Sequence, residues 1–308
     1  MAQAAAVPPA KASKTRALIN AGRISTRVWF DVLAPLATLL VVSGGRPDWG
    51  PALLVIVMLV LFHAGQTYYN DIADVEVDRT SSEADRNQRV LVTQQTTRRD
   101  MAVLGTALIA ASLVCAAFVS WQVLALLAVT TLLVLGYNFE PVRFAGRPLA
   151  TQIFWPLMWG SIYWMSTAAT GDEHWKPGLW FLAFVVVFMG LGESITQDTR
   201  DADNDADGGR RTTVVVFGLG PTTVFALATH VLSLAPLAIF GIVYPLPIWA
   251  TVAAMAAVAV WLYYFFRAWR VLRNSFEKDS ARLTHVGSIY AFTAVNVIVC
   301  AGVFLGAR

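Results

Sequence analysis

The sequence has few charged residues and few cysteines. Only 14% of its 308 residues are Asp, Glu, Lys or Arg, whereas about 25% is typical of a soluble globular domain. Its two cysteines, Cys115 and Cys300, lie in apolar runs without metal-ligand spacing, which argues against a disulfide framework or a cysteine-based metal site. The first twenty residues lack the continuous apolar core of a secretory signal peptide. With a hydrophobic content of 56%, the sequence favours a polytopic membrane protein.

Long apolar runs predict an all-α membrane fold. Nine runs approach the ~20 residues that a helix needs to cross the hydrocarbon core of a bilayer. They cover residues 28–45, 51–69, 102–118, 121–138, 149–168, 177–196, 221–243, 247–266 and 286–306. We expect about nine transmembrane helices around a central cavity, organised as two parallel four-helix repeats plus one helix.

The positive charges lie almost entirely on one side of these predicted spans. Twenty of the 23 Lys and Arg residues fall before the first run or in the connections that follow even-numbered runs. The opposite side keeps Arg46, Lys176 and Arg308. Because cytoplasmic connections are enriched in Lys and Arg, we expect a multi-pass protein of the cell membrane with a cytoplasmic N-terminus. We interpret residues 1–22 as a flexible cytoplasmic tail and residues 23–308 as a single transmembrane domain.

Two acidic sets each place three aspartates at offsets of three and then four residues, after the cytoplasmic end of an even-numbered run. They are Asp71, Asp74 and Asp78 in the first acidic set, and Asp198, Asp201 and Asp205 in the second acidic set. On a helix these offsets put the carboxylates on one face, where like charges repel unless a cation lies over them. Carboxylate oxygens suit Mg²⁺, which completes its shell with waters and substrate phosphates. We therefore expect all six aspartates to ligate Mg²⁺, directly or through water, at a site open to the cytoplasm.

These motifs resemble those of the UbiA superfamily of intramembrane prenyltransferases. The first acidic set follows Asn70, and the second precedes a Gly-Arg-Arg-Thr stretch at residues 209–212. Residues 137–143 read Tyr-Asn-Phe-Glu-Pro-Val-Arg, which is similar to the Tyr-x-x-x-Pro-x-Arg stretch of the family. Family members that prenylate quinone precursors usually carry an Arg-Pro pair after the first motif, whereas residues 86–90 have no proline. This departure concerns the acceptor and leaves the diphosphate chemistry unchanged.

The resemblance implies an Mg²⁺-dependent prenyltransferase. It would move an isoprenyl group from a prenyl diphosphate to a lipophilic, aromatic acceptor, after metal-assisted ionisation of the diphosphate. The residues expected to carry catalysis are Asp71, Asp74, Asp198 and Asp201. The residues expected to bind substrate are Asn70, Tyr68, Arg86, Arg89, Tyr137, Arg143, Trp159 and Arg211. Arginine pairs with phosphate oxygens in a bidentate manner, and aromatic faces stabilise cations. The alternative roles are membrane-surface anchoring for the arginines and helix packing for Trp159.

Two other functions stay open at this point. An intramembrane terpene cyclase of the same superfamily would act on a prenyl diphosphate without an acceptor. A cation transporter would use the acidic sets as ion sites, but such sites usually lie near the bilayer midplane, and these carboxylates lie at predicted helix ends. We expect no nucleic-acid partner, and the oligomeric state is open.

A few polar residues near the motifs have simpler interpretations. Asp203 and Asp207 lie off the acidic face and are expected to be solvated. Asp31 is an ionisable residue at membrane depth, where such residues are costly, and we interpret it as a partner of Arg27, one helical turn earlier. We interpret His63 as a hydrogen-bonded histidine of the core, with substrate contact as the alternative.

Overall fold

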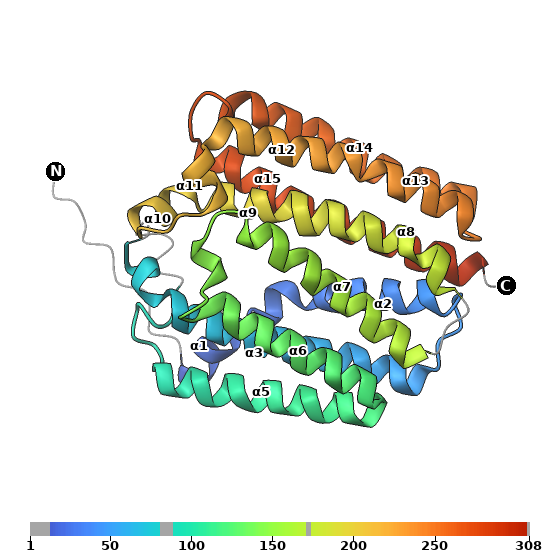
Figure 1. The fold of residues 1–308 in the computed structure, drawn as a ribbon, viewed down its shortest axis with the longest axis horizontal. Helices are drawn as coiled ribbons and strands as arrows, with labels where there is room; N and C mark the ends of the chain where they lie inside the picture. The colour runs from blue at the N-terminus through green and yellow to red at the C-terminus, as the bar shows by residue number, and fades with distance from the viewer. Residues whose placement is uncertain (1–12, 81–88, 171–173, 307–308) are drawn as a thin grey trace.

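The computed structural model describes residues 13–80, 89–170 and 174–306, with the backbone alone for residues 24–28. The described residues are helical apart from turns and short connections, so the all-α prediction is confirmed, and the long helices lie side by side in one bundle (Figure 1). In chain order they are α1 (Lys14–Ala21), α2 (Ile24–Val42), α3 (Trp49–Thr80), α5 (Arg98–Val119), α6 (Trp121–Asn138), the 3-10 helix η1 (Phe144–Gly146), α7 (Ala150–Thr170), α8 (Trp175–Val185), the π-helix η2 (Val186–Glu193), α9 (Ser194–Arg200), α10 (Ala202–Asp207), α11 (Thr213–Phe217), α12 (Leu219–Leu232), α13 (Leu234–Val243), α14 (Ile248–Leu272) and α15 (Lys278–Gly306).

Seven helical segments in the described part of the chain are long and apolar enough to cross a membrane. They are α3, α5, α6, the continuous segment α8–η2–α9, the segment α12–α13, α14 and α15. The apolar part of α2, Trp29–Val42, is shorter, and α7 is a 21-residue helix with Pro156 inside it. The multi-pass membrane fold is confirmed, while the number of nine spans stays a prediction. The division into a tail (1–22) and one domain (23–308) also stays a prediction; α1 lies within the predicted tail.

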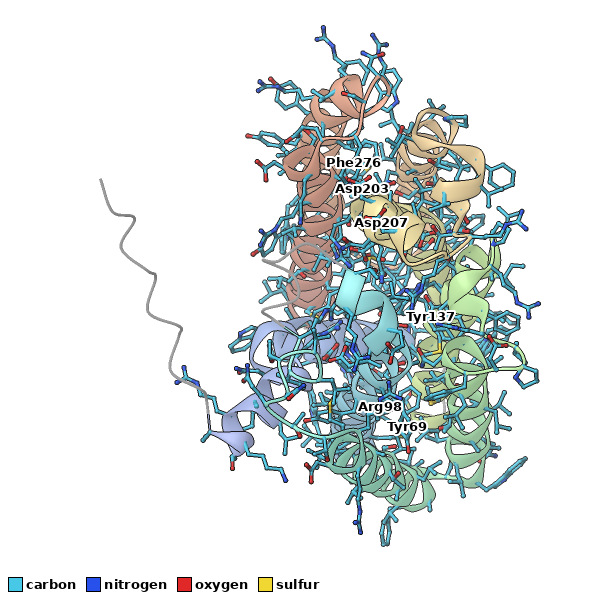
Figure 2. All side chains as sticks on the ribbon, turned by 90° about the vertical axis from the view of Figure 1, so that its left-hand side faces the viewer. Tyr69, Arg98, Tyr137, Asp203, Asp207 and Phe276 are labelled. Atoms are coloured by element: carbon cyan, nitrogen blue, oxygen red, sulfur yellow. The ribbon has the colours of Figure 1, made fainter. Side chains whose placement is uncertain are left out.

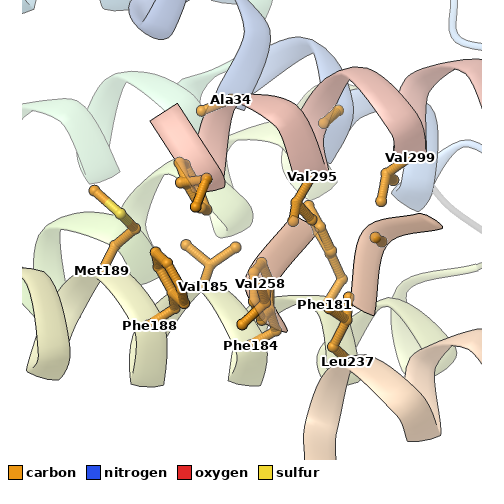
Figure 3. Close-up of a cluster of buried hydrophobic side chains, with 14 of the residues drawn as sticks. Ala34, Phe181, Phe184, Val185, Phe188, Met189, Leu237, Val258, Val295 and Val299 are labelled. Carbon is orange, nitrogen blue, oxygen red and sulfur yellow. The ribbon is translucent and has the colours of Figure 1, made fainter. Parts of the chain in front are cut away.

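Two hydrophobic clusters lie in the two halves of the bundle. In the first half, α3, α5, α6 and α7 bury side chains such as Phe62, Leu127 and Phe154. In the second half, α8, η2 and helices α12 to α15 bury a set that includes Phe181 and Phe188 (Figure 3). Side chains of α2 and α7 belong to both clusters. Because lipid is as apolar as these side chains, close packing rather than exclusion from water holds membrane helices together. The packing of α2 and α7 against both clusters therefore joins the two halves into one unit.

Helices α3 and α5 approach each other closely at two glycines. A Cβ atom on Gly65 would lie 2.7 Å from Cγ1 of Ile109, and a Cβ on Gly105 would lie 3.2 Å from the carbonyl oxygen of Gly65. Small residues let the backbones of membrane helices come together in this way. The contact fixes the rotation of α3 about its own axis, and therefore determines which side chains of α3 face the bundle interior.

A small cavity lies in the interior of the described bundle. Its volume is about 10 Å³, which has room for about one water molecule. It lies between α2, α7, α8 and α15, and its lining includes Ala34, Thr38, Trp159, Tyr163, Phe292 and Asn296.

Candidate active site

Both acidic sets lie at the same end of the bundle. The last turns of α3 carry the first set, and the second set lies on α9, on α10 and at Asp201 between them; α10 contacts α3 at the left-hand end in Figure 1. Figure 2 views this end directly and shows Asp203 and Asp207 near its centre. Both of these side chains are exposed, as predicted, whereas Asp205 between them is buried. The bundle therefore turns one carboxylate of α10 inward and leaves its two neighbours to solvent.

The first acidic set has the geometry that its spacing predicts. Helix α3 continues without a break from Trp49 to Thr80, so offsets of three and four keep the three carboxylates on one side. Asp71 and Asp78 are buried, and Asp74 is half-buried. Nδ2 of Asn70 donates a hydrogen bond to Oδ2 of Asp74 over 3.0 Å. Asn70 is thus placed to orient this carboxylate.

The second acidic set departs from the predicted helical face. Helix α9 ends at Arg200 and α10 begins at Ala202, because Asp201 has φ −97° and ψ 5°, outside the α-helical region. The expectation of one continuous helical face is therefore wrong for this set. Asp198 on α9 is buried, and Asp205 on α10 faces inward from a different helix axis.

Two polar side chains at the start of α7 orient Asp198. Oγ1 of Thr151 donates to Oδ2 of Asp198 over 3.2 Å, and Nε2 of Gln152 donates to the same oxygen over 3.4 Å. Oγ1 of Thr213 in turn donates to Oε1 of Gln152 over 2.6 Å. None of these three residues belongs to a predicted motif. For Thr151 and Gln152, the signal in the sequence is that polar side chains begin an otherwise apolar run.

Arg210 connects the two acidic sets. Its guanidinium forms an ion pair with Asp74, and its Nη1 lies 3.4 Å from Oδ1 of Asp205. A Cβ atom on Gly208 would lie 2.8 Å from Cγ1 of Val77, so glycine at this position allows the end of α10 to lie against α3. The carboxylates of both sets therefore surround one cationic side chain.

Three further arginines pair with Asp71, Asp78 and Asp201, whereas Asp198 is bound by Thr151 and Gln152. Nη2 of Arg23 lies 2.9 Å from Oδ1 of Asp71, and Nε of Arg89 lies 3.2 Å from Oδ1 of Asp78. Arg200 forms an ion pair with Asp201, its neighbour in the chain. Of these three arginines, only Arg89 was predicted to bind substrate.

Burial and these arginines set the charge of the acidic groups beyond the helical spans. Burial raises the pKa of Asp205 to about 7, against the opposing charge of Arg210. Burial alone would also raise the pKa of Asp201, but the charge and hydrogen bond of Arg200 hold that pKa below its ordinary value. Burial disfavours the charged form of Arg89, yet the carboxylates around it raise its pKa, so it stays cationic. The site concentrates negative charge that needs cations to be stable.

The remaining predicted substrate residues are spread around the site. Tyr137 is buried and stacks on Phe154, with ring centroids 4.2 Å apart. Trp159 contacts the ring of Phe292 edge-on at 5.4 Å and lines the small central cavity. Asn70 and Arg89 lie among the carboxylates, as described above. Tyr137 and Trp159 therefore belong to two separate groups of ring contacts, Tyr137 with Phe154 and Trp155, and Trp159 with Phe30 and Phe292.

Four candidates are placed elsewhere or fall outside the described residues. The hydroxyl of Tyr68 donates to the carbonyl oxygen of Leu18 over 2.8 Å, so it points toward α1. Arg143 lies 3.8 Å from Glu140 in the connection after α6. The side chain of Arg211 is exposed. Arg86 lies outside the described residues, and its predicted role stays a prediction.

The donor chemistry of the site fits Mg²⁺. Among the described residues, no three His, Cys, Asp or Glu side chains converge as a metal-binding group. Mg²⁺ does not require one, because it usually takes one or two carboxylates and fills its shell with water and substrate phosphates. Buried carboxylate oxygens are of the hard type that it prefers.

Comparison with known proteins identifies relatives along most of the chain. Residues 32–296 match the UbiA prenyltransferase family. A protein from Methanoculleus marisnigri, named digeranylgeranylglyceryl phosphate synthase, is 26% identical over a stretch that covers 58% of this chain and 61% of that protein. A protein of the same name from Thermococcus kodakarensis is 25% identical over 85% of this chain and 89% of its own length.

Solved structures share the fold. A UbiA homologue from Aeropyrum pernix K1 superposes with a TM-score of 0.69 at 20% identity, over 92% of this chain and 98% of that chain. A UbiA homologue from Archaeoglobus fulgidus, described as bound to GPP and Mg²⁺, gives a TM-score of 0.67 at 15% identity, over 91% of this chain and 99% of that chain. The prediction of a membrane-embedded prenyltransferase is confirmed at the level of the family. With a family match that extends over most of its length, the chain belongs to the UbiA prenyltransferase family.

Proposed function

We propose that this chain transfers an isoprenyl group from a prenyl diphosphate to a lipophilic acceptor, with Mg²⁺ held between the two acidic sets. The observation that carries the proposal is the contact of Arg210 with both Asp74 and Asp205, which surrounds one cation with carboxylates of both sets. A site of this kind suits a divalent ion together with the charge of a diphosphate. The Archaeoglobus fulgidus homologue, described as bound to GPP and Mg²⁺, supports the proposal.

The aspartates and the arginines would have different roles at the diphosphate. We assign the six aspartates of the two acidic sets as metal ligands, and among them Asp71, Asp74, Asp198 and Asp201 as the catalytic residues. Mg²⁺, when bound, acts as a Lewis acid that stabilises negative charge on the leaving diphosphate. Arg89 and Arg210 now bind carboxylates, and a guanidinium binds phosphate oxygens in the same bidentate manner. These two arginines are therefore placed to release the carboxylates and bind the diphosphate instead.

The aromatic residues would hold the isoprenoid part of the substrate. Tyr137 lies near the acidic sets, and Trp159 lines the cavity deeper in the bundle. The electron-rich face of such a ring stabilises an allylic cation as well as an apolar chain. The bias of Lys and Arg supports a cytoplasmic location for the acidic end and the N-terminus.

The acceptor has two candidate classes. The family resemblance of the sequence favours an aromatic acceptor. Both curated relatives are named for digeranylgeranylglyceryl phosphate, which makes a glyceryl phosphate ether the second candidate. Both are lipophilic molecules that enter from the bilayer.

A product screen tests the proposal. The full-length protein in lipid nanodiscs would receive prenyl diphosphates of increasing chain length with Mg²⁺ and a phenolic acceptor, a glyceryl phosphate ether or no acceptor. Mass spectrometry should detect a prenylated acceptor that disappears when EDTA removes the metal. A terpene formed without any acceptor would instead identify a cyclase. Metal flux in proteoliposomes without release of diphosphate would identify a transporter.

A further inference from the structure

A pair of titratable side chains lies inside the bundle, separate from the acidic sets. Nδ1 of His63 on α3 binds Oδ1 of Asp31 on α2, and only 20% and 13% of the two side chains are exposed. The predicted partner of Asp31 was Arg27, whose side chain lies outside the described residues. Ionisable residues at membrane depth are costly and are commonly retained for a function.

His63 faces the interior on the same side of α3 as the first acidic set. Asn70 lies seven residues further along, which is two turns and about 10 Å of helix axis. Gly65 lies two residues from His63, and therefore about 200° around the helix, where it packs against α5. The imidazole consequently points away from α5 and toward α2.

Asp31 lies on the face of α2 that lines the central cavity. Ala34 and Thr38 follow it at offsets of three and seven residues, which is one helical face, and both line that cavity. Trp29, on the other side of α2, is 73% exposed. The pair of Asp31 and His63 therefore lies between the acidic sets and the cavity, about one turn from the latter.

A substrate with its diphosphate at the acidic sets and its isoprenoid chain in the cavity would extend past this pair, so an acceptor hydroxyl that approaches C1 from the interior would lie between C1 and His63. We propose that His63 accepts the proton of an acceptor hydroxyl and that Asp31 positions the imidazole; this inference rests on the proposed function. The acceptor oxygen bonds to C1 of the prenyl group as the C1–O bond to the diphosphate breaks. The electron pair of that bond leaves with the diphosphate, and the hydroxyl proton moves to Nε2 of His63.

The geometry of the pair suits this role. Asp31 engages Nδ1, and among the described residues no partner binds Nε2, so the second ring nitrogen is available to a substrate. A carboxylate on Nδ1 fixes the imidazole orientation and stabilises the imidazolium that forms on protonation. The acceptor class that follows is a lipophilic molecule with a nucleophilic hydroxyl, either a phenol or a glycerol-type alcohol.

Transfer assays on the full-length protein in nanodiscs test the pair, with geranylgeranyl diphosphate, Mg²⁺ and either 1-naphthol or geranylgeranylglyceryl phosphate. His63→Ala should lower kcat by about 100-fold or more, the usual contribution of a general base, and should leave the Kd for geranylgeranyl diphosphate unchanged. Added imidazole should restore a large part of the lost rate. Asp31→Asn should lower kcat with little change in KM. His174→Ala, at the start of α8 and the opposite end of the bundle, is the matched control.

The possible results separate this inference from the proposed function. A folded His63→Ala variant that keeps wild-type transfer, or whose loss imidazole does not reverse, would overturn the role of the pair. If that variant is unstable, His63→Gln replaces it, because a glutamine fills the site but accepts no proton. Wild-type protein that binds geranylgeranyl diphosphate but transfers nothing to either acceptor would instead count against the proposed function.

Discussion

Arg210 binds Asp74 although 136 residues separate them in the chain. The same guanidinium reaches Asp205, so one side chain ties the end of α3 to α10. Removing one partner of a buried ion pair leaves the other charge without compensation, which is costly. This contact therefore stabilises the arrangement in which the two acidic sets face each other.

Arg210→Ala should lower the free energy of unfolding by about 3 kcal/mol, because two inward-facing carboxylates lose their counter-charge. Mg²⁺ should stabilise this variant more than the wild-type protein, since the cation can bind the released carboxylates. Denaturation in detergent with and without Mg²⁺ measures both effects. Arg211→Ala is the matched control, because the Arg211 side chain is exposed. Equal losses of stability in both variants would show that the ion pairs of Arg210 with Asp74 and Asp205 do not stabilise the fold.

Asp71→Ala or Asp198→Ala should reduce turnover by on the order of 10³-fold or more, while the protein still inserts and folds. Both residues are buried at the acidic end, and each would contribute to holding the metal against the diphosphate. Product formation, measured beside gel-filtration profiles of the purified variants, checks this. Turnover near the wild-type value in either variant would show that the acidic set of that variant does not hold the metal.

The double variant Asp71→Ala with Asp198→Ala should be hardly slower than either single variant. Residues that act as a unit on one diphosphate give strongly non-additive losses. Asp203→Ala and Asp207→Ala serve as controls and should change turnover little, since both side chains are exposed. Kinetics at saturating Mg²⁺ decide the matter; losses that multiply would indicate two independent sites.

Tyr68→Phe should cost about 0.5–1.5 kcal/mol of stability and leave turnover unchanged. The substitution removes the hydrogen bond from the hydroxyl to Leu18 on α1 but keeps the buried ring. Thermal unfolding and steady-state kinetics on the same preparation measure the two quantities. A large fall in turnover with unchanged stability would instead support the predicted contact of Tyr68 with substrate.

The sequence alone predicts the arrangement of the carboxylates correctly where a motif lies on one unbroken helix. The spacing of Asp71, Asp74 and Asp78 predicts a shared face, and α3 provides it because nothing interrupts the helix. The same spacing fails for the second set, because the chain leaves the helical region at Asp201. That break accompanies the ion pair with Arg200 and the packing of α10 on α3, which a spacing argument does not contain.

The choice among neighbouring side chains also depended on tertiary structure. Arg210 and Arg211 are equivalent in the sequence, but the turn at Gly209, with φ 70°, precedes them and the fold directs Arg210 inward. Tyr68 precedes the first acidic set, yet its hydroxyl reaches α1. The rotation of α3 against α5 decides this, and it depends on contacts at Gly65 that local periodicity does not reveal.

Helix α3 is longer than a membrane is thick. Its 32 residues extend over about 48 Å, whereas the hydrocarbon core of a bilayer measures about 30 Å. The polar residues 70–80, which include the first acidic set, follow the apolar run 51–69, so we expect the carboxylates to lie beyond the hydrocarbon core, at the level of the lipid headgroups. Bilayer thickness then becomes a variable of the reaction, because a thicker membrane would draw the carboxylates out of water and a thinner one would expose the apolar part of α3.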